Sequence, residues 1–241
     1  EVTKKIGYLL DKNGINYKDE METIRNYIKV QETINKKDSV QFLKTHSYLF
    51  NIENNPFTNL ENSLGVVYIV RDPRNVLISA ANHNQISHEK TLEQIVHGSV
   101  MGKNDGETTR VYTGNWASNY KSWKSFESAS KYLLIKYEDL IFDKEKTFLK
   151  ILDFIHKLSK KSFVLDNAKF KNVLNTTDFG NMQKMENETG FHESLVDNKT
   201  GKKAKFFYLG PKNDWKKLLN KVIQKKIEEA FKKEMTELGY L

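Results

Sequence analysis

Apolar residues in this chain gather in short runs separated by longer segments of mixed character. The runs at residues 66–70 and 132–135 are apolar without polar alternation, which is typical of strands covered on both faces in a parallel sheet. A third short run, residues 40–43, is predicted to be another strand.

The segments between these runs predict helices, at residues 21–28, from 73 onward, and at 91–101, 112–126, 144–157 and 161–172. In the last helix, Ile223, Ile227, Phe231 and Met235 recur at fourfold spacing and form one apolar stripe. Short buried strands separated by helices predict an α/β fold. We expect residues 1–241 to form a single three-layer domain with a parallel sheet flanked by helices.

The first of these strands ends on charged residues. Arg71 follows the run directly, Asp72 suits a helix N-cap, and Pro73 suits the first helical position. Arg71 would then lie at the carboxyl end of a parallel strand, beside a helix amino terminus, where open α/β sheets bind ligands and anions. A strand-to-helix turn with a surface salt bridge explains the local pattern equally well.

Polar groups also follow the other two strands, as Lys44-Thr45-His46 and Tyr137-Glu138-Asp139. A parallel sheet would bring all three strand ends to one edge. There His46 can exchange a proton near neutral pH, and Lys44 supplies positive charge. A lone Lys-x-His triplet is also compatible with a structural or exposed histidine.

The amino-acid composition indicates which kinds of partner the chain can bind. The chain has a formal net charge of +8 and a pI near 9.3, which favours anions such as nucleic acid, phosphate-bearing cofactors, acidic glycans or a membrane surface. Most lysines are scattered through helices and fit a solvated face. No tract of five consecutive basic residues or RNA-binding signature occurs, so we expect no nucleic-acid partner.

The chain contains no cysteine, which excludes disulfides, thiolate metal sites and a cysteine nucleophile. Its six histidines show no metal-ligand spacing, so no metal is predicted. No run approaches 18 apolar residues, and the first residues do not resemble a signal peptide. We therefore expect no membrane span and a reducing, cytoplasmic location.

Six segments between residues 41 and 219, taken in order, resemble the cytosolic-type sulfotransferase family. They are Lys44-Thr45-His46, VVYIVRDPRNVLIS from Val66, GNWASNYKSW from Gly114, Tyr137-Glu138-Asp139-Leu140, Thr177-Asp178-Phe179 with Met182, and Gly210 to Trp215, which is similar to a Gly-x-x-Gly-Asp-Trp loop. The resemblance implies the P-loop-NTPase-like fold of that family. It also implies transfer of a sulfuryl group from 3′-phosphoadenosine 5′-phosphosulfate (PAPS) to a hydroxyl or amine of a small-molecule or sugar acceptor.

The resemblance also implies roles for single residues. Arg71 and Ser79 would hold the 3′-phosphate of the cofactor, His46 would be the general base, and Lys44 would stabilise charge developing on the transferring group. The remaining cofactor-binding residues would contact the adenine or approach the cofactor closely: Tyr137, Thr177, Phe179, Met182 and Gly210. The scheme needs no metal. Histidine as the base favours a small-molecule acceptor.

The chain departs from the family at two places. No Pro-Lys-Ser-Gly-Thr-Thr-Trp segment, which cradles the phosphosulfate in the family, occurs in it; we expect an amino-terminal strand and loop to be missing from the domain. Tyr208-Leu209 stands where the family has Arg-Lys, and Lys205 or Lys212 is a possible substitute. The alternative function is a catalytically silent relative that binds nucleotide or other anions. The oligomeric state stays open, with a homodimer possible.

Overall fold

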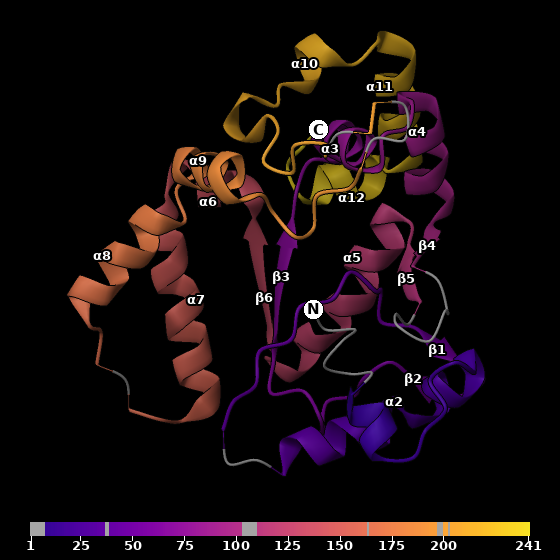
Figure 1. Ribbon diagram of the computed structural model, residues 1–241, viewed down its shortest axis with the longest axis vertical. Coiled ribbons are helices and arrows are strands. Elements are labelled where there is room, and N and C mark those ends of the chain that lie inside the picture. Colours follow the sequence, from indigo (N-terminus) through magenta and orange to yellow (C-terminus); the bar gives the residue numbers. More distant parts are fainter. Residues whose placement is uncertain (1–7, 37–38, 103–109, 163, 197–199, 202) are drawn as a thin grey trace. The chain divides into compact units, whose positions relative to one another are not determined.

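The computed structural model describes residues 8–36, 39–102, 110–162, 164–196, 200–201 and 203–241 (Figure 1). The strands in this part of the chain are β1 (Asn51–Ile52), β2 (Asn55–Pro56), β3 (Val66–Val70), β4 (Ser99–Met101), β5 (Val111–Gly114) and β6 (Tyr132–Lys136). The α-helices are α2 (Glu20–Asn35), α3 (Pro73–Asn84), α4 (His88–His97), α5 (Trp116–Lys124), α6 (Tyr137–Phe142), α7 (Lys144–Ser159), α8 (Asn167–Thr176), α9 (Phe179–Thr189), α10 (Trp215–Leu218), α11 (Lys221–Ala230) and α12 (Lys232–Glu237). Two 3-10 helices are η1 (Ser125–Ala129) and η2 (Gly210–Lys212).

Strands β3 and β6 pair with each other, and their arrows point the same way in Figure 1. Both predicted strands are thus confirmed, and with them the α/β class with a parallel sheet. The expectation that β3 is covered on both faces is wrong at Ile69, which is 53% exposed. An apolar run shows that a segment favours a strand, but the cover on each face comes from other elements.

The strand predicted at residues 40–43 is absent, and Phe42 there is 70% exposed. The segment that follows is also irregular and is bonded by side chains of α5. Trp123 donates its indole N–H to the Ser47 carbonyl at 2.9 Å, and the Ser122 hydroxyl accepts the Leu49 N–H at 2.9 Å. The Tyr48 N–H also donates to the Tyr112 carbonyl of β5 at 2.8 Å. These contacts satisfy backbone groups of the segment although it forms no strand.

Two predicted helices are partly strand. In the segment expected as one helix at 91–101, the helix ends at His97. Gly98 (φ +86°) then turns the chain into β4. The segment expected at 112–126 begins with β5, which pairs antiparallel with β4. Helix α5 starts only after Asn115, which forms a capping box with Ser118. Pairing between these two segments, which lie close together in the sequence, overrides their local helical preference.

Two further helices differ in their bounds. The helix expected at 161–172, of which residue 163 lies outside the described residues, begins at Asn167 because the Asp166 carboxylate accepts the N–H groups of Ala168 and Lys169. The last helix is two helices, α11 and α12, divided at Phe231 (φ −123°). The predicted stripe at positions 223, 227, 231 and 235 is nevertheless fully buried.

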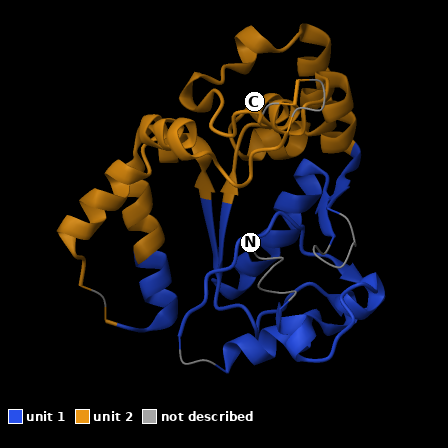
Figure 2. Cartoon of the chain, in the orientation of Figure 1, with its two compact units in different colours: residues 1–68, 97–134, 153–161 blue, residues 69–96, 135–152, 162–241 orange. Residues whose placement is uncertain are grey.

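The chain divides into two compact units (Figure 2). Unit 1 comprises residues 1–68, 97–134 and 153–161. Its core is aromatic: Phe50 contacts the rings of Tyr27, Phe57 and Tyr112, with centroids 5.2 to 6.0 Å apart. Such offset and edge contacts stabilise a small core beyond the area they bury.

Unit 2 comprises residues 69–96, 135–152 and 162–241. Helix α3 contacts α10 and α11 within it. Helix α3 buries Leu77, Ile78 and Ala81, and α11 buries Ile223 and Ile227. This packing places the amino terminus of α3, with the polar residues before it, beside the segment that leads into α10.

Candidate functional site

Arg71 comes directly after β3 in unit 2, and α3 begins at Pro73. Asp72 is the N-cap of α3, as predicted, because its carboxylate accepts the N–H of Arg74. From this position Arg71 Nη1 donates to the Ser79 hydroxyl oxygen at 3.2 Å, and Nη2 donates to the Gly210 carbonyl at 3.3 Å. The structure thus brings Arg71, Ser79 and Gly210 together.

Tyr137 completes this group from the end of the neighbouring strand. It is the first residue of α6, directly after β6, and the guanidinium carbon of Arg71 lies 4.1 Å from the centroid of its ring. Burial lowers the pKa of Arg71, whereas Tyr137, Glu138 and Asp72 favour its charged form. The site thus presents a partly desolvated positive charge beside an aromatic face.

Phe179 lies against Gly210. A Cβ added to Gly210 would come within 2.3 Å of the Phe179 ring, and φ at this glycine is +50°. Only glycine combines this approach with this backbone conformation without strain. The loop that carries the Gly210 carbonyl to Arg71 therefore rests on the aromatic ring at the start of α9.

The other two predicted base-pocket residues lie near the same helix start. Thr177 is exposed and donates its hydroxyl to the Val173 carbonyl at 2.6 Å, at the end of α8. Met182 is half-buried in the first turn of α9. They share the α8–α9 turn with Phe179.

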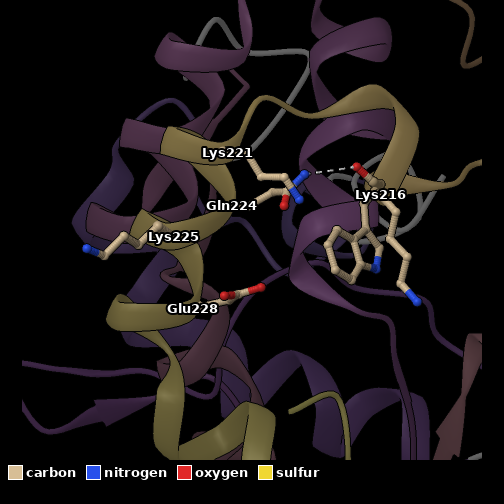
Figure 3. Close-up of a pocket in the computed structure, with 6 residues that line it drawn as sticks. Lys216, Lys221, Gln224, Lys225 and Glu228 are labelled. Carbon is tan, nitrogen blue, oxygen red and sulfur yellow. Dashed lines mark hydrogen bonds between the residues drawn. The ribbon is translucent and has the colours of Figure 1, made fainter.

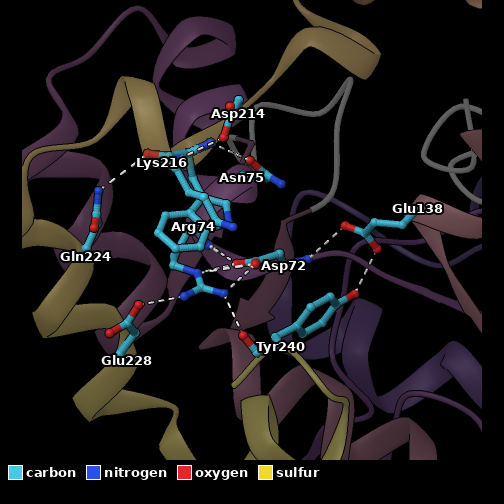
Figure 4. A network of polar contacts seen from close by, with 10 residues as sticks. Asp72, Arg74, Asn75, Glu138, Asp214, Lys216, Gln224, Glu228 and Tyr240 are labelled. Atoms are coloured by element: carbon cyan, nitrogen blue, oxygen red, sulfur yellow. Dashed lines mark hydrogen bonds and ion pairs between the residues drawn. The ribbon is translucent and has the colours of Figure 1, made fainter.

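A network of polar contacts surrounds Arg74 (Figure 4). Arg74 binds Asp72 at 2.7 Å and Glu228 at 2.6 Å, and it donates to the Tyr240 carbonyl at 2.8 Å. Its guanidinium carbon also lies 3.7 Å from the centroid of the Trp215 ring. Burial alone would lower the pKa of Arg74, but the two carboxylates raise it.

Glu138 links the ends of β3 and β6. One of its carboxylate oxygens accepts the Asp72 N–H at 3.4 Å, and the other accepts the Tyr240 hydroxyl at 3.0 Å. Figure 4 shows Glu138 reaching towards both groups from the far side of Asp72. The sequence singled out Glu138 only as part of a polar strand end; its two partners are distant in sequence.

Asn213 is a further residue that sequence reasoning missed. Its amide nitrogen donates to the Ser79 hydroxyl oxygen and to the Asn75 carbonyl, each at 3.0 Å. It occupies the position of the second glycine in the Gly-x-x-Gly-Asp-Trp pattern, with φ of −72°. An asparagine replacing that glycine was the available signal.

Lys205 and Lys212 were the possible substitutes for the Arg-Lys pair of the family. In the described structure they are placed as follows. Lys205 contacts the side-chain oxygen of Asn187, and Lys212 is an exposed residue of η2. Tyr208 itself is about half exposed. Arg71 itself thus supplies the positive charge at the Arg71–Ser79 contact.

His46 and Lys44 belong to unit 1, and the seven other predicted site residues belong to unit 2. Both side chains are exposed. Asn119 of α5 donates its amide to the His46 carbonyl at 3.1 Å and to the Thr113 carbonyl at 2.8 Å, and it accepts the Tyr68 hydroxyl at 3.0 Å. This anchoring fixes the backbone of the His46 segment without a strand.

A cavity of about 580 Å³ lies elsewhere in unit 2 (Figure 3). Its lining residues are Trp215, Lys216, Lys221, Gln224, Lys225 and Glu228. Arg71 and Ser79 are not among them, so this cavity is separate from the predicted phosphate site.

None of the helices in the described residues has the length and apolar character needed to cross a bilayer. Within the same part of the chain, His, Asp and Glu side chains form no group of three suited to a metal ion.

A family model for the sulfotransferase domain matches residues 6–239. The chain belongs to the sulfotransferase family. It is 25% identical over 177 residues to sulfotransferase 2A1 of Homo sapiens, covering 72% of this chain and 57% of that protein. It is 28% identical over 155 residues to 3-beta-hydroxysteroid sulfotransferase of Cavia porcellus, covering 63% and 49%. The chain therefore spans about half the length of the curated relatives it matches.

Solved structures show the same fold. The structure of mouse sulfotransferase SULT7A1 complexed with PAP aligns with a TM-score of 0.58 at 19% identity, covering 85% of this chain and 68% of that one. Retinol dehydratase in complex with androsterone and inactive cofactor PAP aligns with a TM-score of 0.54 at 15% identity, covering 97% and 76%. The predicted sulfotransferase family and α/β fold are confirmed.

Proposed function

We propose that this sulfotransferase-family chain binds PAPS through unit 2 and moves its sulfuryl group to a hydroxyl or amine of a small-molecule acceptor. One observation carries the proposal: Arg71, Ser79, Tyr137 and Gly210 meet at the carboxyl end of β3. A guanidinium fork and a hydroxyl are donors suited to phosphate oxygens, and the Tyr137 ring is suited to a base. Two structural relatives are complexes with PAP.

The residues present fit the nucleotide part of PAPS, which would supply the activated sulfuryl group. In the transfer, the acceptor oxygen or nitrogen bonds to sulfur while the sulfur–oxygen bond to the 5′-phosphate breaks and PAP leaves. His46 takes the proton of the acceptor, and Lys44 offsets negative charge that develops on the sulfuryl group. Positioning and fixed positive charge supply most of the rate enhancement, because such transfer needs little covalent chemistry from protein groups.

The names of the relatives support one class of acceptor. Curated relatives are named as steroid sulfotransferases, and a structural relative holds androsterone. We therefore propose a small apolar alcohol as the acceptor. A cytoplasmic location and the absence of a metal requirement stay predictions, supported by the lack of cysteine and by a scheme in which side chains supply all the charge.

Calorimetric titration with PAP tests the nucleotide site. We expect the wild-type chain to bind PAP in the micromolar range and the Arg71→Ala variant to lose this binding. A matched control is Arg25→Ala, since Arg25 lies in unit 1 and forms an exposed ion pair with Glu53. Equal binding by wild type and Arg71→Ala would contradict the proposed site.

A turnover assay separates the proposed enzyme from the silent relative. Incubation with PAPS and a hydroxysteroid should release PAP and form a sulfate ester. Binding of PAP without any turnover would support the alternative, a silent relative that keeps the nucleotide site but lacks the phosphosulfate loop.

A further inference from the structure

The Ser79 hydroxyl oxygen receives two hydrogen bonds, from Arg71 Nη1 at 3.2 Å and from the Asn213 amide at 3.0 Å. A hydroxyl oxygen has two lone pairs and a single hydrogen. Both acceptor positions are therefore used, and the hydrogen must point away from both donors. Among the residues that the structure describes, no acceptor for this hydrogen is recorded, which leaves the hydroxyl ready to donate to another group.

Chemistry fixes the orientation of the Asn213 amide. Its nitrogen also faces the Asn75 carbonyl at 3.0 Å. A backbone carbonyl only accepts hydrogen bonds, so the nitrogen rather than the oxygen must lie on this side. The side-chain oxygen of Asn75 in turn accepts the Trp215 N–H at 3.2 Å. Asn213 is thus locked between α3 and the start of α10.

The Asn213 side chain does not satisfy all of its own polar atoms. Asn213 is 7% exposed, and its amide oxygen is buried with no partner among the described residues. A buried acceptor without a hydrogen bond lowers stability. The Asn213 amide therefore donates two hydrogen bonds at the expense of an unsatisfied buried oxygen, which lowers stability. One of the two bonds goes to Ser79, which also contacts Arg71.

We propose that Asn213 is a positioning residue for 3′-phosphate recognition, an inference that rests on the proposed function. Together with Arg71 it holds the Ser79 oxygen so that the hydroxyl hydrogen faces a 3′-phosphate oxygen. Tyr208-Leu209 brings no cation to the loop, so the preference for a 3′-phosphate depends on Arg71 and on this ordered hydroxyl. Asn213 itself does not contact the nucleotide in this arrangement.

The test compares two nucleotides, PAP and adenosine 5′-phosphate, which lacks the 3′-phosphate. We expect Asn213→Ala to weaken PAP binding about three- to tenfold, the loss typical of one neutral hydrogen bond, and to leave adenosine 5′-phosphate binding unchanged. Asn213→Asp keeps the shape of the side chain. Its carboxylate would accept the Ser79 hydrogen and add negative charge, so a larger loss confined to PAP is expected.

A double-mutant cycle shows whether Asn213 acts through Ser79. In the Ser79→Ala background, Asn213→Ala should cause no further loss of PAP affinity, because the hydroxyl that it orients is gone. Independent, additive losses would overturn the proposal, as would equal losses for both nucleotides. Asn172→Ala, an exposed change on α8, is the control for substitution of an asparagine.

The outcomes also separate this inference from the function on which it rests. If wild type binds no PAP, both fall. If wild type binds PAP and Arg71→Ala does not, while Asn213→Ala and Asn213→Asp bind as wild type does, only the role of Asn213 is wrong. Thermal unfolding of each variant identifies losses caused by misfolding, and the isosteric Asn213→Asp then carries the test if the alanine variant is unfolded.

Discussion

The guanidinium group of Arg74 lies flat on the ring of Trp215, with 3.7 Å between the guanidinium carbon and the ring centroid. The edge of the same group binds Asp72, Glu228 and the Tyr240 carbonyl. One cation thus joins the N-cap of α3 to α11 and to the segment after α12. Arg71 directly precedes Asp72, the N-cap that this cation binds.

Removing Arg74 should therefore destabilise the protein strongly. Arg74 is 4% exposed, and Arg74→Ala leaves Asp72 buried without its cation. We expect the free energy of unfolding to fall by about 3 to 5 kcal/mol, measured by urea denaturation. In Arg74→Lys the free energy of unfolding should fall less, because lysine keeps the charge but lacks the stacked, forked geometry of arginine.

Arg25→Ala is the control for this measurement. Arg25 and Glu53 are 3.5 Å apart, with side chains 59% and 65% exposed, so their loss should change stability by less than about 1 kcal/mol. Similar effects for Arg74→Ala and Arg25→Ala would contradict the importance of the buried network.

Gly210→Ala should weaken PAP binding through Phe179. The new Cβ would meet the ring at 2.3 Å, so either the ring or the loop that contacts Arg71 must move. Gly190→Ala is a matched control, because Gly190 also has a positive φ (+76°) but has nothing within 4 Å of an added Cβ. Both variants should lose about 1 to 3 kcal/mol of stability from the backbone conformation, since Gly190 with ψ of 174° lies in a region that only glycine adopts easily, and only Gly210→Ala should lose nucleotide affinity. Equal PAP affinities in calorimetry would show that the contact does not shape the site.

Because of Glu186, the stability of unit 2 should depend on pH. Burial raises its pKa, but hydrogen bonds from the Phe206 and Phe207 N–H groups and the Ser194 hydroxyl outweigh burial, and the net pKa is below the ordinary value of 4.5. A pKa that is lower in the folded than in the unfolded state stabilises the protein above pH 4.5. This contribution to stability is lost as the pH falls through the folded-state pKa.

Glu186→Gln should accordingly lower the free energy of unfolding by about 1 to 3 kcal/mol near neutral pH. The difference from wild type should shrink as the pH falls below 4.5. Chemical denaturation across this pH range measures it. A difference that is constant with pH would show that the carboxylate charge contributes nothing.

His46→Ala should stop turnover while PAP binding persists. Loss of a general base lowers the rate by about a hundredfold to ten-thousandfold, and the nucleotide contacts of unit 2 involve other residues. Steady-state assay with PAPS and calorimetry with PAP measure the two effects. Normal turnover would show that another group takes the proton.

The sequence alone determined the elements whose signals are local. The unbroken apolar runs predicted β3 and β6, Asp72-Pro73 predicted the start of α3, and the fourfold spacing predicted the buried stripe from Ile223 to Met235. Ordered motifs also identified the family. These features depend on the side chains of a few neighbouring residues, which the sequence displays directly.

Only the tertiary structure decided which distant groups meet. The pairing of β4 with β5 overrode two predicted helices, and the strand predicted at residues 40–43 did not form. The contacts of Asn213 with Ser79 and of Tyr240 with Glu138 span 134 and 102 residues. Hydrogen bonds and cation–π contacts act over a few ångströms in space, so their partners are set by how helices pack and not by spacing along the chain.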